Sequence, residues 1–502
     1  MENEIRHLNY QTLRQTGYKG YLLPQAPERI LQFGEGNFLR AFADYFVDVA
    51  NERCGFNTKV LMVQPRGAGK CERVNRQQGL FTLYLRGLEE GRAVSDKRVI
   101  SSISRCISPQ AHYEEFLKAA HNPALRFIIS NTTEAGIMYE EEARFADAPP
   151  KSFPAKLTRF LYERYMAFGD EPGKGLVILP CELIDDNGRV LMECVGRYAA
   201  RWQLEPGFAG WLAQENLFCS NLVDRIVTGY PAGEAAALAA ENGYQDELMN
   251  AAERFGLWVI EGPESLKEEL PFAKAGLPVL VTQDHKPYKR RKVRILNGAH
   301  TTMAMAGYLA GQNLVRECMQ NPELYGFVRG AILEEIVPAL DMPEAELKAF
   351  AADVLERFEN PYISHLLLSI SLNSISKWRA RVLPSAKEYL RKTGRLPNRL
   401  VFGFAALLQF YCGSSLGPEG LVAHRGGQAY TVQDEAEVLN FFLQHAANTP
   451  EQLALAACRR EGFWGENLAA LPGFAAMAAA SLAAIRTLGV LEALRQLEAG
   501  LL

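Results

Sequence analysis

The stretch ILQFGEGNFLR, residues 30–40, decides the fold of the first part of this chain. An apolar run typical of a buried strand leads into a Gly-x-Gly turn, and a helical pattern follows. Gly34 permits a tight turn, and Gly36 lets a phosphate group approach the free N–H groups at the start of the helix. The pattern predicts a dinucleotide-binding turn. An ordinary strand-to-helix connection is the alternative, because Leu39 stands where a third glycine is expected. The residues predicted to build this turn and bind the cofactor are Ile30, Leu31, Gln32, Phe33, Gly34, Glu35, Gly36, Asn37, Phe38, Leu39, Arg40 and Ala41.

Strand patterns recur through the first half of the chain, with amphipathic helical stretches such as 37–51 and 112–120 between them. This alternation predicts a parallel sheet covered by helices. From about Asn297 onward the patterns are long and helical, and the Gly-rich stretch 413–428 predicts a loop. We therefore expect an α/β domain over residues 1–285 and a mainly α-helical domain over residues 286–502. The further strands are expected at Lys59–Val63, Phe127–Ser130 and 176–179, and the later helices at 323–337, 343–358, 363–376, 400–411 and after Thr449.

Composition narrows the class of protein. The 502 residues are 48% hydrophobic and 22% charged, with a net charge of −4, so the basic bias expected of a nucleic-acid or membrane-surface protein is missing. The nine cysteines are odd in number and form no CxxC pair, which argues against a disulfide framework and a structural zinc site. The N-terminus is polar and charged, and no run of about 18 apolar residues occurs. We expect a cytoplasmic protein without a metal.

Two polar turns follow predicted strands and bear on the cofactor. The strand Lys59–Val63 leads to Arg66, with no acidic residue to hold a ribose hydroxyl. Arg66 and Lys70 can instead meet a 2′-phosphate, which leaves NADP open, or they are solvated loop cations. Thr133 and Glu134 follow the next strand, and ligands of open α/β sheets lie beyond the carboxyl ends of strands. We expect this pair to line the nicotinamide pocket, a capping turn being the alternative.

A lysine, an asparagine and a histidine stand together near the predicted domain boundary. If the stretch is α-helical, at roughly 100° per residue, Asn297 and His300 share a face and Lys292 lies within about 140° of both. Carbonyl reduction needs such a set, because Asn and His donors stabilise the developing alkoxide and a desolvated lysine delivers the proton. A surface lysine, a capping asparagine and a buried structural histidine are the alternative.

The pattern Lys-x4-Asn-x2-His resembles the active-site signature of the long-chain mannitol dehydrogenase family. Other marks of that family stand in the same order along the chain: Gly34-x-Gly36-x-Phe38-x-Arg40, Thr133-Glu134, Cys181-Glu182-x4-Asn187-Gly188 and Val223-Asp224-Arg225-Ile226. The resemblance implies an α/β Rossmann-type N-terminal domain, a mainly α-helical C-terminal domain and NAD as cofactor. It also implies Lys292 as the acid–base residue, Asn297 and His300 as the oxyanion-stabilising pair, and Asp224 as a substrate-pocket residue.

Within the family, the stretches NTTEAG, PCELID, LVDRIVTGYP and ILNGAHT are similar to those of the members that act on uronates. This implies reduction of D-tagaturonate to D-altronate with NADH, in hexuronate catabolism. Polyol members usually carry asparagine where this chain has Leu183, which speaks against a neutral polyol. Fructuronate reduction, a mannitol-type polyol dehydrogenase and a dinucleotide-binding sensor without turnover remain alternatives. The sequence does not indicate an oligomeric state.

A uronate or aldonate carries a carboxylate, which favours Arg or Lys as its partner. Two groups of cations are candidates: 289–291, beside the lysine signature, and Lys377, Arg379 and Arg381. We favour the second group because the polyol enzymes place a substrate-contacting lysine near this point. Lys377 and Arg379 are therefore predicted to bind substrate, and solvated surface cations are the alternative.

Overall fold

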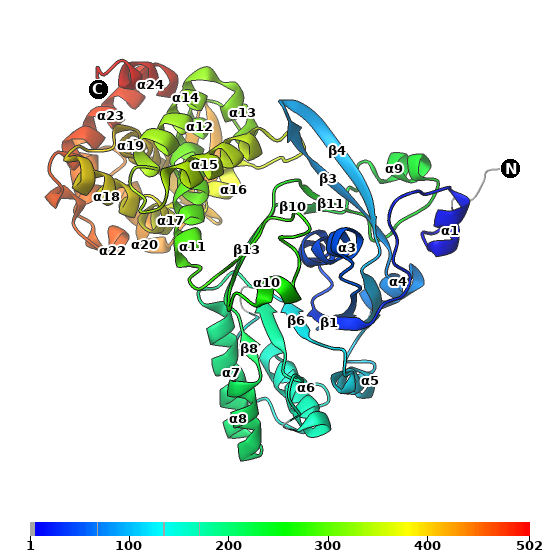
Figure 1. Ribbon diagram of the computed structural model, residues 1–502. Helices are drawn as coiled ribbons and strands as arrows, with labels where there is room; N and C mark the ends of the chain where they lie inside the picture. Colours follow the sequence, from blue (N-terminus) through cyan, green and yellow to red (C-terminus); the bar gives the residue numbers. More distant parts are fainter. Residues whose placement is uncertain (1–5, 68, 134–135, 170) are drawn as a thin grey trace. The chain divides into compact units, whose positions relative to one another are not determined.

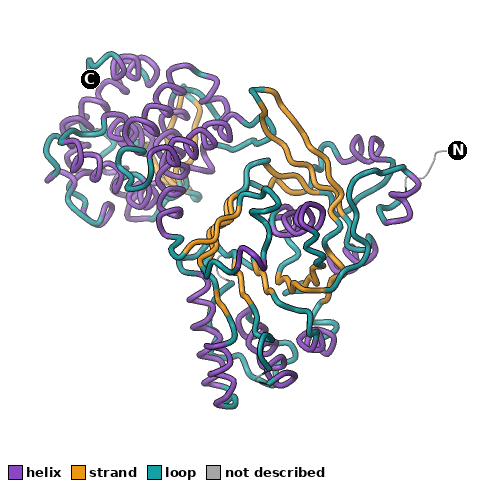
Figure 2. Tube along the Cα trace, viewed as in Figure 1, coloured by secondary structure: helices purple, strands orange, loops and turns teal. Residues whose placement is uncertain are grey.

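The computed structural model describes residues 6–67, 69–133, 136–169 and 171–502 (Figure 1). The chain divides into two compact units. The first comprises Met1–Gly87 and Val94–His285, and the second comprises Leu88–Ala93 and Lys286–Leu502. Figure 2 shows strands and helices interleaved in the first unit and a dominance of helices in the second. The predicted fold class is confirmed: an α/β Rossmann-type part is followed by a mainly α-helical part.

A six-stranded parallel sheet forms the centre of the first unit, in the order β5-β2-β1-β6-β7-β8. The strand order reverses direction between β1 and β6, and this switch point is where doubly wound sheets bind their ligands. Each strand predicted from its apolar run is present within one or two residues. The strands are β1 Glu28–Phe33, β2 Lys59–Val63, β5 Ile103–Ile107, β6 Phe127–Ser130, β7 Val177–Pro180 and β8 Leu217–Phe218.

Successive residues of β1 point to opposite faces of the sheet, and both faces are buried. Ile30 belongs to one apolar core and Leu31 to the other. The helix expected over 37–51 is broken at Phe42, whose ring packs 4.7 Å from Phe46 and 5.3 Å from Trp258. The covering helices are α2 Asn37–Ala41, α3 Ala43–Cys54, α4 Gly69–Arg76, α5 Tyr113–Lys118, α6 Phe153–Phe168, α7 Asn187–Arg201 and α8 Pro206–Gln214.

Two smaller mixed sheets and three short helices complete the first unit. One sheet has the order β10-β11-β3-β4 and the other β13-β12-β9. β9 ends at Asp224, which is buried. The strands are β3 Phe81–Glu89, β4 Arg92–Ile100, β9 Asn221–Asp224, β10 Val227–Gly229, β11 Asn250–Glu253, β12 Leu257–Glu261 and β13 Val279–Thr282, and the helices are α1 Tyr10–Gln15, α9 Ala235–Asn242 and α10 Leu266–Glu269.

The second unit is built around helices α12 and α19, which pack closely because Gly403 lies against Thr302. Two segments are π-helical: η2 Val293–Gly298 and η3 Ala331–Ile336. The α-helices before residue 411 are α11 Lys286–Lys292, α12 Ala299–Leu309, α13 Val315–Gln320, α14 Pro322–Gly330, α15 Glu344–Glu359, α16 Leu367–Ser371, α17 Ser374–Arg381, α18 Leu383–Thr393 and α19 Asn398–Phe410. The tail is helical, as predicted, with α20 Ala436–Gln444, α21 Pro450–Cys458, α22 Glu461–Trp464, α23 Phe474–Leu488 and α24 Val490–Glu498.

The loop predicted at 413–428 is wrong. The chain there forms an antiparallel sheet of β14 Gly413–Gly417, β15 Gly420–Arg425 and β16 Gln428–Val432. Gly426 and Gly427 both have positive φ, as a tight two-residue hairpin requires. Buried residues alternate along the paired strands, including Leu421, Ala423 and Val432. The glycines therefore mark turns between short strands.

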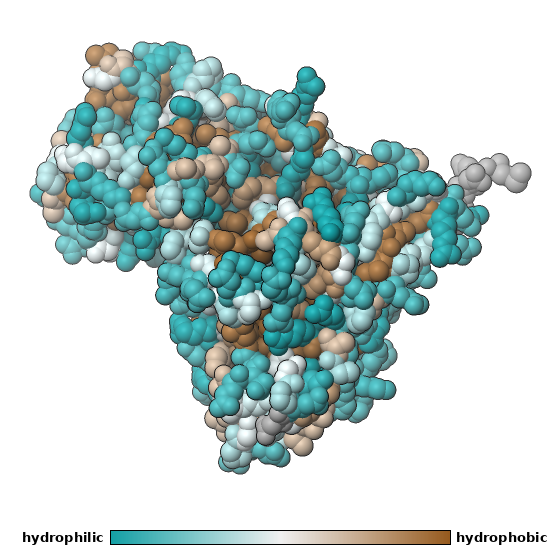
Figure 3. Space-filling view, viewed as in Figure 1, coloured by the Kyte–Doolittle hydropathy of each residue, from teal (hydrophilic) through white to brown (hydrophobic). Residues whose placement is uncertain are grey.

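Polar side chains cover most of the face shown in Figure 3, with apolar ones in smaller groups between them. Among the described residues, no helix combines the length and the apolar character needed to cross a membrane.

Candidate functional site

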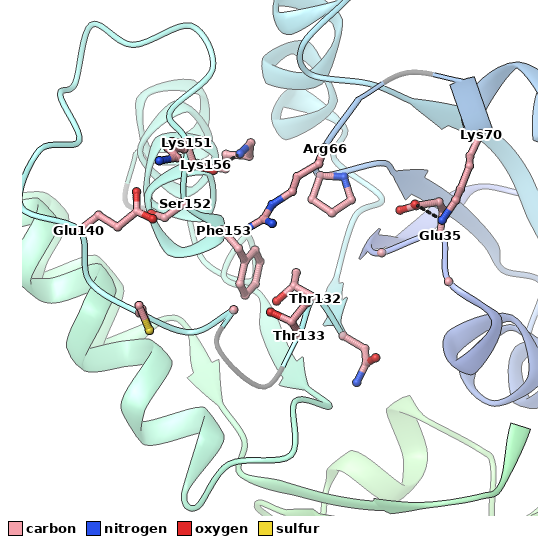
Figure 4. A pocket seen from close by; sticks show the side chains of 16 residues that line it. Glu35, Arg66, Lys70, Thr132, Thr133, Glu140, Lys151, Ser152, Phe153 and Lys156 are labelled. Carbon is pink, nitrogen blue, oxygen red and sulfur yellow. Dashed lines mark hydrogen bonds and ion pairs between the residues drawn. The ribbon is translucent and has the colours of Figure 1, made fainter. Parts of the chain in front are cut away.

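A cavity of about 250 Å³ lies in the first unit, beyond the carboxyl ends of β1, β2 and β6. This is the switch point of the parallel sheet, so the topology alone marks it as the binding crevice. Figure 4 shows its lining side chains. They are Gly34, Glu35, Gly36, Pro65, Arg66, Lys70, Asn131, Thr132, Thr133, Gly136, Met138, Glu140, Lys151, Ser152, Phe153 and Lys156.

The two glycines of the turn have different structural requirements. Gly34 has φ +122°, and a Cβ at this position would lie 2.8 Å from the carbonyl oxygen of Asn131. Gly36 precedes the first residue of α2 and has no protein atom within 4 Å of a Cβ position. The chain thus needs Gly34 to make the turn, whereas Gly36 leaves open space before the N–H groups of α2, where a pyrophosphate can approach.

Only part of the predicted turn reaches the cavity. Gly34, Glu35 and Gly36 line it, whereas the strand residues 30–33 are fully buried. The buried Gln32 amide donates to the Gly34 carbonyl at 3.0 Å and to Asp44 at 3.2 Å, so it shapes the turn from behind. Ile30, Leu31, Gln32 and Phe33 therefore lie behind the turn, and their predicted part in binding the cofactor stays a prediction.

The residues of α2 also position the turn. Phe38, Leu39 and Ala41 pack against or within the apolar core of the first unit. Arg40 is buried, and its guanidinium donates to Asn37 Oδ1 at 2.6 Å and to the carbonyl of Leu248. Asn37 and Arg40 line a second cavity beside the first.

Several basic side chains line the main cavity. Arg66, which follows β2, extends toward Thr132 and Phe153 (Figure 4). Lys70 pairs with Glu35 at 3.0 Å. Lys156 is buried and donates to the carbonyl of Lys151 at 2.6 Å. Burial and the nearby Arg66 charge lower the pKa of Lys156 to about 8.

The turn after β6 holds one predicted residue in place. Thr133 lines the same cavity as Arg66, the residue that follows β2. Which part of the cofactor it contacts stays a prediction. Glu134 lies outside the described residues.

The sequence interpretation missed two supports of this cavity. One is the N-terminus of α6, where Ser152 Oγ accepts the backbone N–H of Ala155 at 3.3 Å. The stretch Ser-Phe-Pro was the available signal, since serine caps helices and proline suits their first turn. The other is Glu182, which the sequence marked only as part of the family pattern and without a role: its buried carboxylate accepts Ser130 Oγ and the Thr132 backbone N–H, both at 3.0 Å. It ties the loop after β6 to β7.

The lysine–asparagine–histidine segment is π-helical, so the predicted α-helical arithmetic is wrong. Lys292 ends α11, Asn297 lies in η2 and His300 lies in the first turn of α12. A π turn is closed by a hydrogen bond between residues five apart, so Lys292 and Asn297 lie about one turn apart on one face. Both side chains are half-buried and His300 is buried. The π turn therefore favours a shared face for Lys292 and Asn297, which five residues of α-helix would not give.

His300 is held as a neutral imidazole. Its ring stacks on Phe358 with 4.3 Å between centroids and meets the His365 ring edge-on at 5.0 Å. Burial, aided by the charges of His365, Arg357 and Arg381, lowers the pKa of His300 well below its ordinary value. A neutral imidazole carries one N–H, so His300 can donate a hydrogen bond to a developing oxyanion without acting as the proton source.

The predicted substrate cations of α17 point in two directions. Lys377 and Arg381 lie four residues apart and are half-buried, with Lys377 Nζ donating to the Ile370 carbonyl at 2.9 Å. Arg379 is exposed, and its guanidinium lies against Gly465. The structure thus separates Arg379 from the other two cations, and its predicted role in binding substrate stays a prediction.

The remaining predicted residues are placed as follows. Asp224 is buried in the first unit, and Leu183 is 62% exposed in the turn that follows β7. Arg291 is buried with its guanidinium 4.4 Å from the ring of Phe350, so among the cations at 289–291 it serves packing. One group of possible metal ligands, Glu261, Asp284 and His285, occurs among the described residues. His285 Nδ1 already hydrogen-bonds Glu261 at 2.6 Å, so a hydrogen-bonded pair accounts for its geometry.

Family comparisons agree with this architecture. The model of the mannitol dehydrogenase Rossmann domain matches residues 28–274, and that of the mannitol dehydrogenase C-terminal domain matches residues 284–486. The chain belongs to the mannitol dehydrogenase family. It is therefore an oxidoreductase that acts on CH–OH groups with a nicotinamide cofactor, and the Rossmann-domain match supports use of NAD.

Individual relatives narrow the branch of the family. Altronate oxidoreductase of Klebsiella pneumoniae strain 342 is 47% identical over 494 residues, covering 97% of this chain and all of the relative. Altronate oxidoreductase of Shigella flexneri is also 47% identical, over 495 residues and with the same coverage. This branch of the family was the one predicted from the sequence.

Solved structures share the fold at lower identity. Mannitol 2-dehydrogenase of Pseudomonas fluorescens, in a ternary complex with NAD and D-mannitol, matches with a TM-score of 0.68 and 23% identity over 98% of this chain and 99% of its own. A substrate-free D-sorbitol dehydrogenase matches with a TM-score of 0.77 and 23% identity over 97% of this chain and all of its own.

Proposed function

We propose that this protein reduces D-tagaturonate to D-altronate with NADH and catalyses the reverse oxidation with NAD. The observation that carries the proposal is the 47% identity with altronate oxidoreductases along their whole length. The departure at Leu183, away from the asparagine usual in polyol enzymes, agrees with a substrate other than a neutral polyol.

The cofactor-binding part of the proposal rests on the first unit. The N–H groups at the start of α2, behind Gly34 and Gly36, would hold the pyrophosphate, and Thr133 and Arg66 would lie along the adenosine ribose. When bound, the reduced nicotinamide supplies the hydride. Among the described residues, Gln64, Pro65 and Arg66 follow β2, and none of them carries a carboxylate that could hold a ribose hydroxyl. The residues after β2 therefore do not select NAD over NADP.

The chemistry rests on the second unit. The Asn297 amide and the neutral His300 N–H donate to the carbonyl oxygen and stabilise the alkoxide that grows there. The Lys292 ammonium then gives its proton to this oxygen, and in the oxidative direction the neutral amine removes it. The π turn that places Lys292 and Asn297 one turn apart lets the proton donor and the oxyanion donor serve the same atom.

Loss of absorbance at 340 nm tests the proposal, with NADH and tagaturonate, fructuronate or fructose in parallel. A clear preference for tagaturonate is expected. Activity with fructuronate or fructose alone would refute the proposed substrate while retaining the reaction class. Absence of NADH oxidation with all three would instead favour a sensor. Repeating the assay with NADPH tests the cofactor, because a kcat/KM for NADPH equal to that for NADH would overturn the NAD assignment.

A further inference from the structure

Two cations of α17 lack an acidic partner. Lys377 and Arg381 lie one helical turn apart, so they share a face, and both are half-buried. Among the residues that the structure describes, neither side chain has a carboxylate oxygen within 4.0 Å, the limit for an ion pair. Burying a positive charge without a negative partner is costly, so this arrangement calls for an anion.

The recorded partners of both cations are neutral. Lys377 Nζ donates to the Ile370 carbonyl at 2.9 Å, and Arg381 Nη1 donates to Thr301 Oγ1 at 3.5 Å. Asp434 is the acidic residue whose charge acts on Lys377. Its carboxylate already accepts the Tyr411 hydroxyl at 2.6 Å and the Ile375 backbone N–H at 3.4 Å. Each cation therefore keeps donor capacity for a ligand, and the guanidinium keeps most of its five N–H groups.

These cations gather beside the catalytic segment of the same unit. The Arg381 carbonyl oxygen lies 3.2 Å from a Cβ position at Gly298, between Asn297 and His300 in the chain. Thr301, which Arg381 contacts, directly follows His300. His365 meets the His300 ring at 5.0 Å, and its pKa is lowered by burial and by the Lys377 charge. The cluster thus presents cations and neutral imidazoles close to the proposed oxyanion donors.

We propose that Lys377 and Arg381 form the clamp for the substrate carboxylate, with Arg381 as the residue that selects a uronate over a neutral ketose. This inference rests on the proposed function and names the part of the site that recognises its substrate class. A guanidinium binds a carboxylate through two parallel N–H···O bonds, whereas an ammonium acts as a point charge. Arg381 therefore supplies orientation, and Lys377 adds charge. The exposed Arg379 takes no part, because it lies on another face against Gly465.

The test compares two substrates that differ at one end. The variants Arg381→Met and Lys377→Met are assayed with tagaturonate and with D-tagatose, in which a hydroxymethyl group replaces the carboxylate. Arg381→Met is expected to lower kcat/KM for tagaturonate about 100-fold, mainly through KM, while kcat/KM for tagatose stays within about threefold. Arg381→Lys should restore part of the loss, because it returns the charge without the paired donors.

The matched control is Arg395→Gln, which removes an exposed arginine outside this cluster. It should leave both substrates unchanged, and thermal unfolding of each variant checks that the fold is kept. An equal loss with tagaturonate and tagatose, or no loss at all, would overturn the clamp. If the wild type itself fails on tagaturonate, the proposed function fails instead. The clamp is then tested by the shift in Tm that gluconate, but not sorbitol, should give in the wild type and lose in Arg381→Met.

Discussion

In the proposed function, the glycine turn after β1 and the π turn before α12 are two different ways of holding an oxygen-rich group with N–H donors. In the glycine turn the backbone provides the donors, and the side chains of β1 are buried behind it. In the π turn the side chains of Lys292 and Asn297 would provide the proposed chemistry, and the backbone sets their spacing. The glycine turn depends on the absence of side chains at Gly34 and Gly36. The π turn depends on which side chains lie on the same face.

The two regions also differ in how they treat charge. The cavity at the glycine turn is lined by cations, among them Arg66 and Lys156, as suits a phosphate. The segment at the π turn contains His300, which burial keeps neutral and which therefore offers a donor rather than a charge. Substitutions should consequently separate binding of the cofactor from turnover, and five of them test the comparison between the two regions.

The largest effect is expected from Lys292→Ala. Removing the proposed proton donor should lower kcat by about 1000-fold, since a positioned acid contributes roughly 100- to 10,000-fold. The glycine turn is untouched, so NADH binding followed by fluorescence titration should stay within about twofold. A variant that keeps most of its kcat would show that the π turn does not supply the proton.

A pair of glycine substitutions should follow. Gly34→Ala places a Cβ 2.8 Å from a backbone oxygen at φ +122°, so it should both raise KM for NADH more than about 30-fold and lower the free energy of unfolding by roughly 2 kcal/mol. Gly36→Ala meets no protein atom within 4 Å and should weaken NADH binding at nearly unchanged stability. Denaturant unfolding and NADH titration separate the two. Equal destabilisation by both would refute the distinction between them.

A smaller effect concerns the support behind the turn. Burial raises the pKa of Asp44 to about 7, above its unfolded value of 3.8. The folded state therefore binds this proton more tightly, and Asp44 lowers stability progressively as pH rises from about 4 through 7. Asp44→Asn removes this loss and should stabilise the protein by on the order of 2 kcal/mol at pH 8, with little gain at pH 4.5. Urea unfolding of both proteins at the two pH values measures the difference, and a gain independent of pH would contradict the assignment.

The smallest effect is expected from Arg379→Gln. The side chain is exposed and lies against Gly465, so kcat/KM for tagaturonate should change less than twofold. A loss above about tenfold would restore the role predicted from the sequence and place the carboxylate on a different face of α17.

The same contrast explains what could be predicted from the sequence. The strands and the Gly34 turn followed from apolar runs and from a glycine that the backbone requires, both of which are local properties. The contribution of Ser152 and Lys156 was missed because sheet topology brings them to the turn from more than a hundred residues away. The roles of Arg379 and Arg381 could not be separated either, because residues two apart on a helix point in different directions and only packing fixes which one faces inward.

The π turn could not be predicted from hydrophobic periodicity, because its extra residue leaves the apolar pattern of α12 intact. The joint catalytic role of Lys292, Asn297 and His300 stays a prediction, and the angles between them were calculated for an α-helix where the chain is π-helical. Likewise, the glycines at 426 and 427 indicated turns, but the two flanking strands were too short and too polar to be recognised.

A π turn is an α turn that has accommodated one additional residue. Deleting a single amino acid within Val293–Gly298 would let α11 and α12 run as one uninterrupted α-helix, and the deletion itself removes none of the apolar residues of α12. In an α-helix of unchanged length, the five-residue spacing would place Lys292 and Asn297 roughly 140° apart, whereas a deletion between them would leave a four-residue spacing and roughly 40°. The five-residue spacing between the proposed proton donor and the proposed oxyanion donor therefore shares a face only because this segment is π-helical, so the type of helical turn matters as much as the residues themselves.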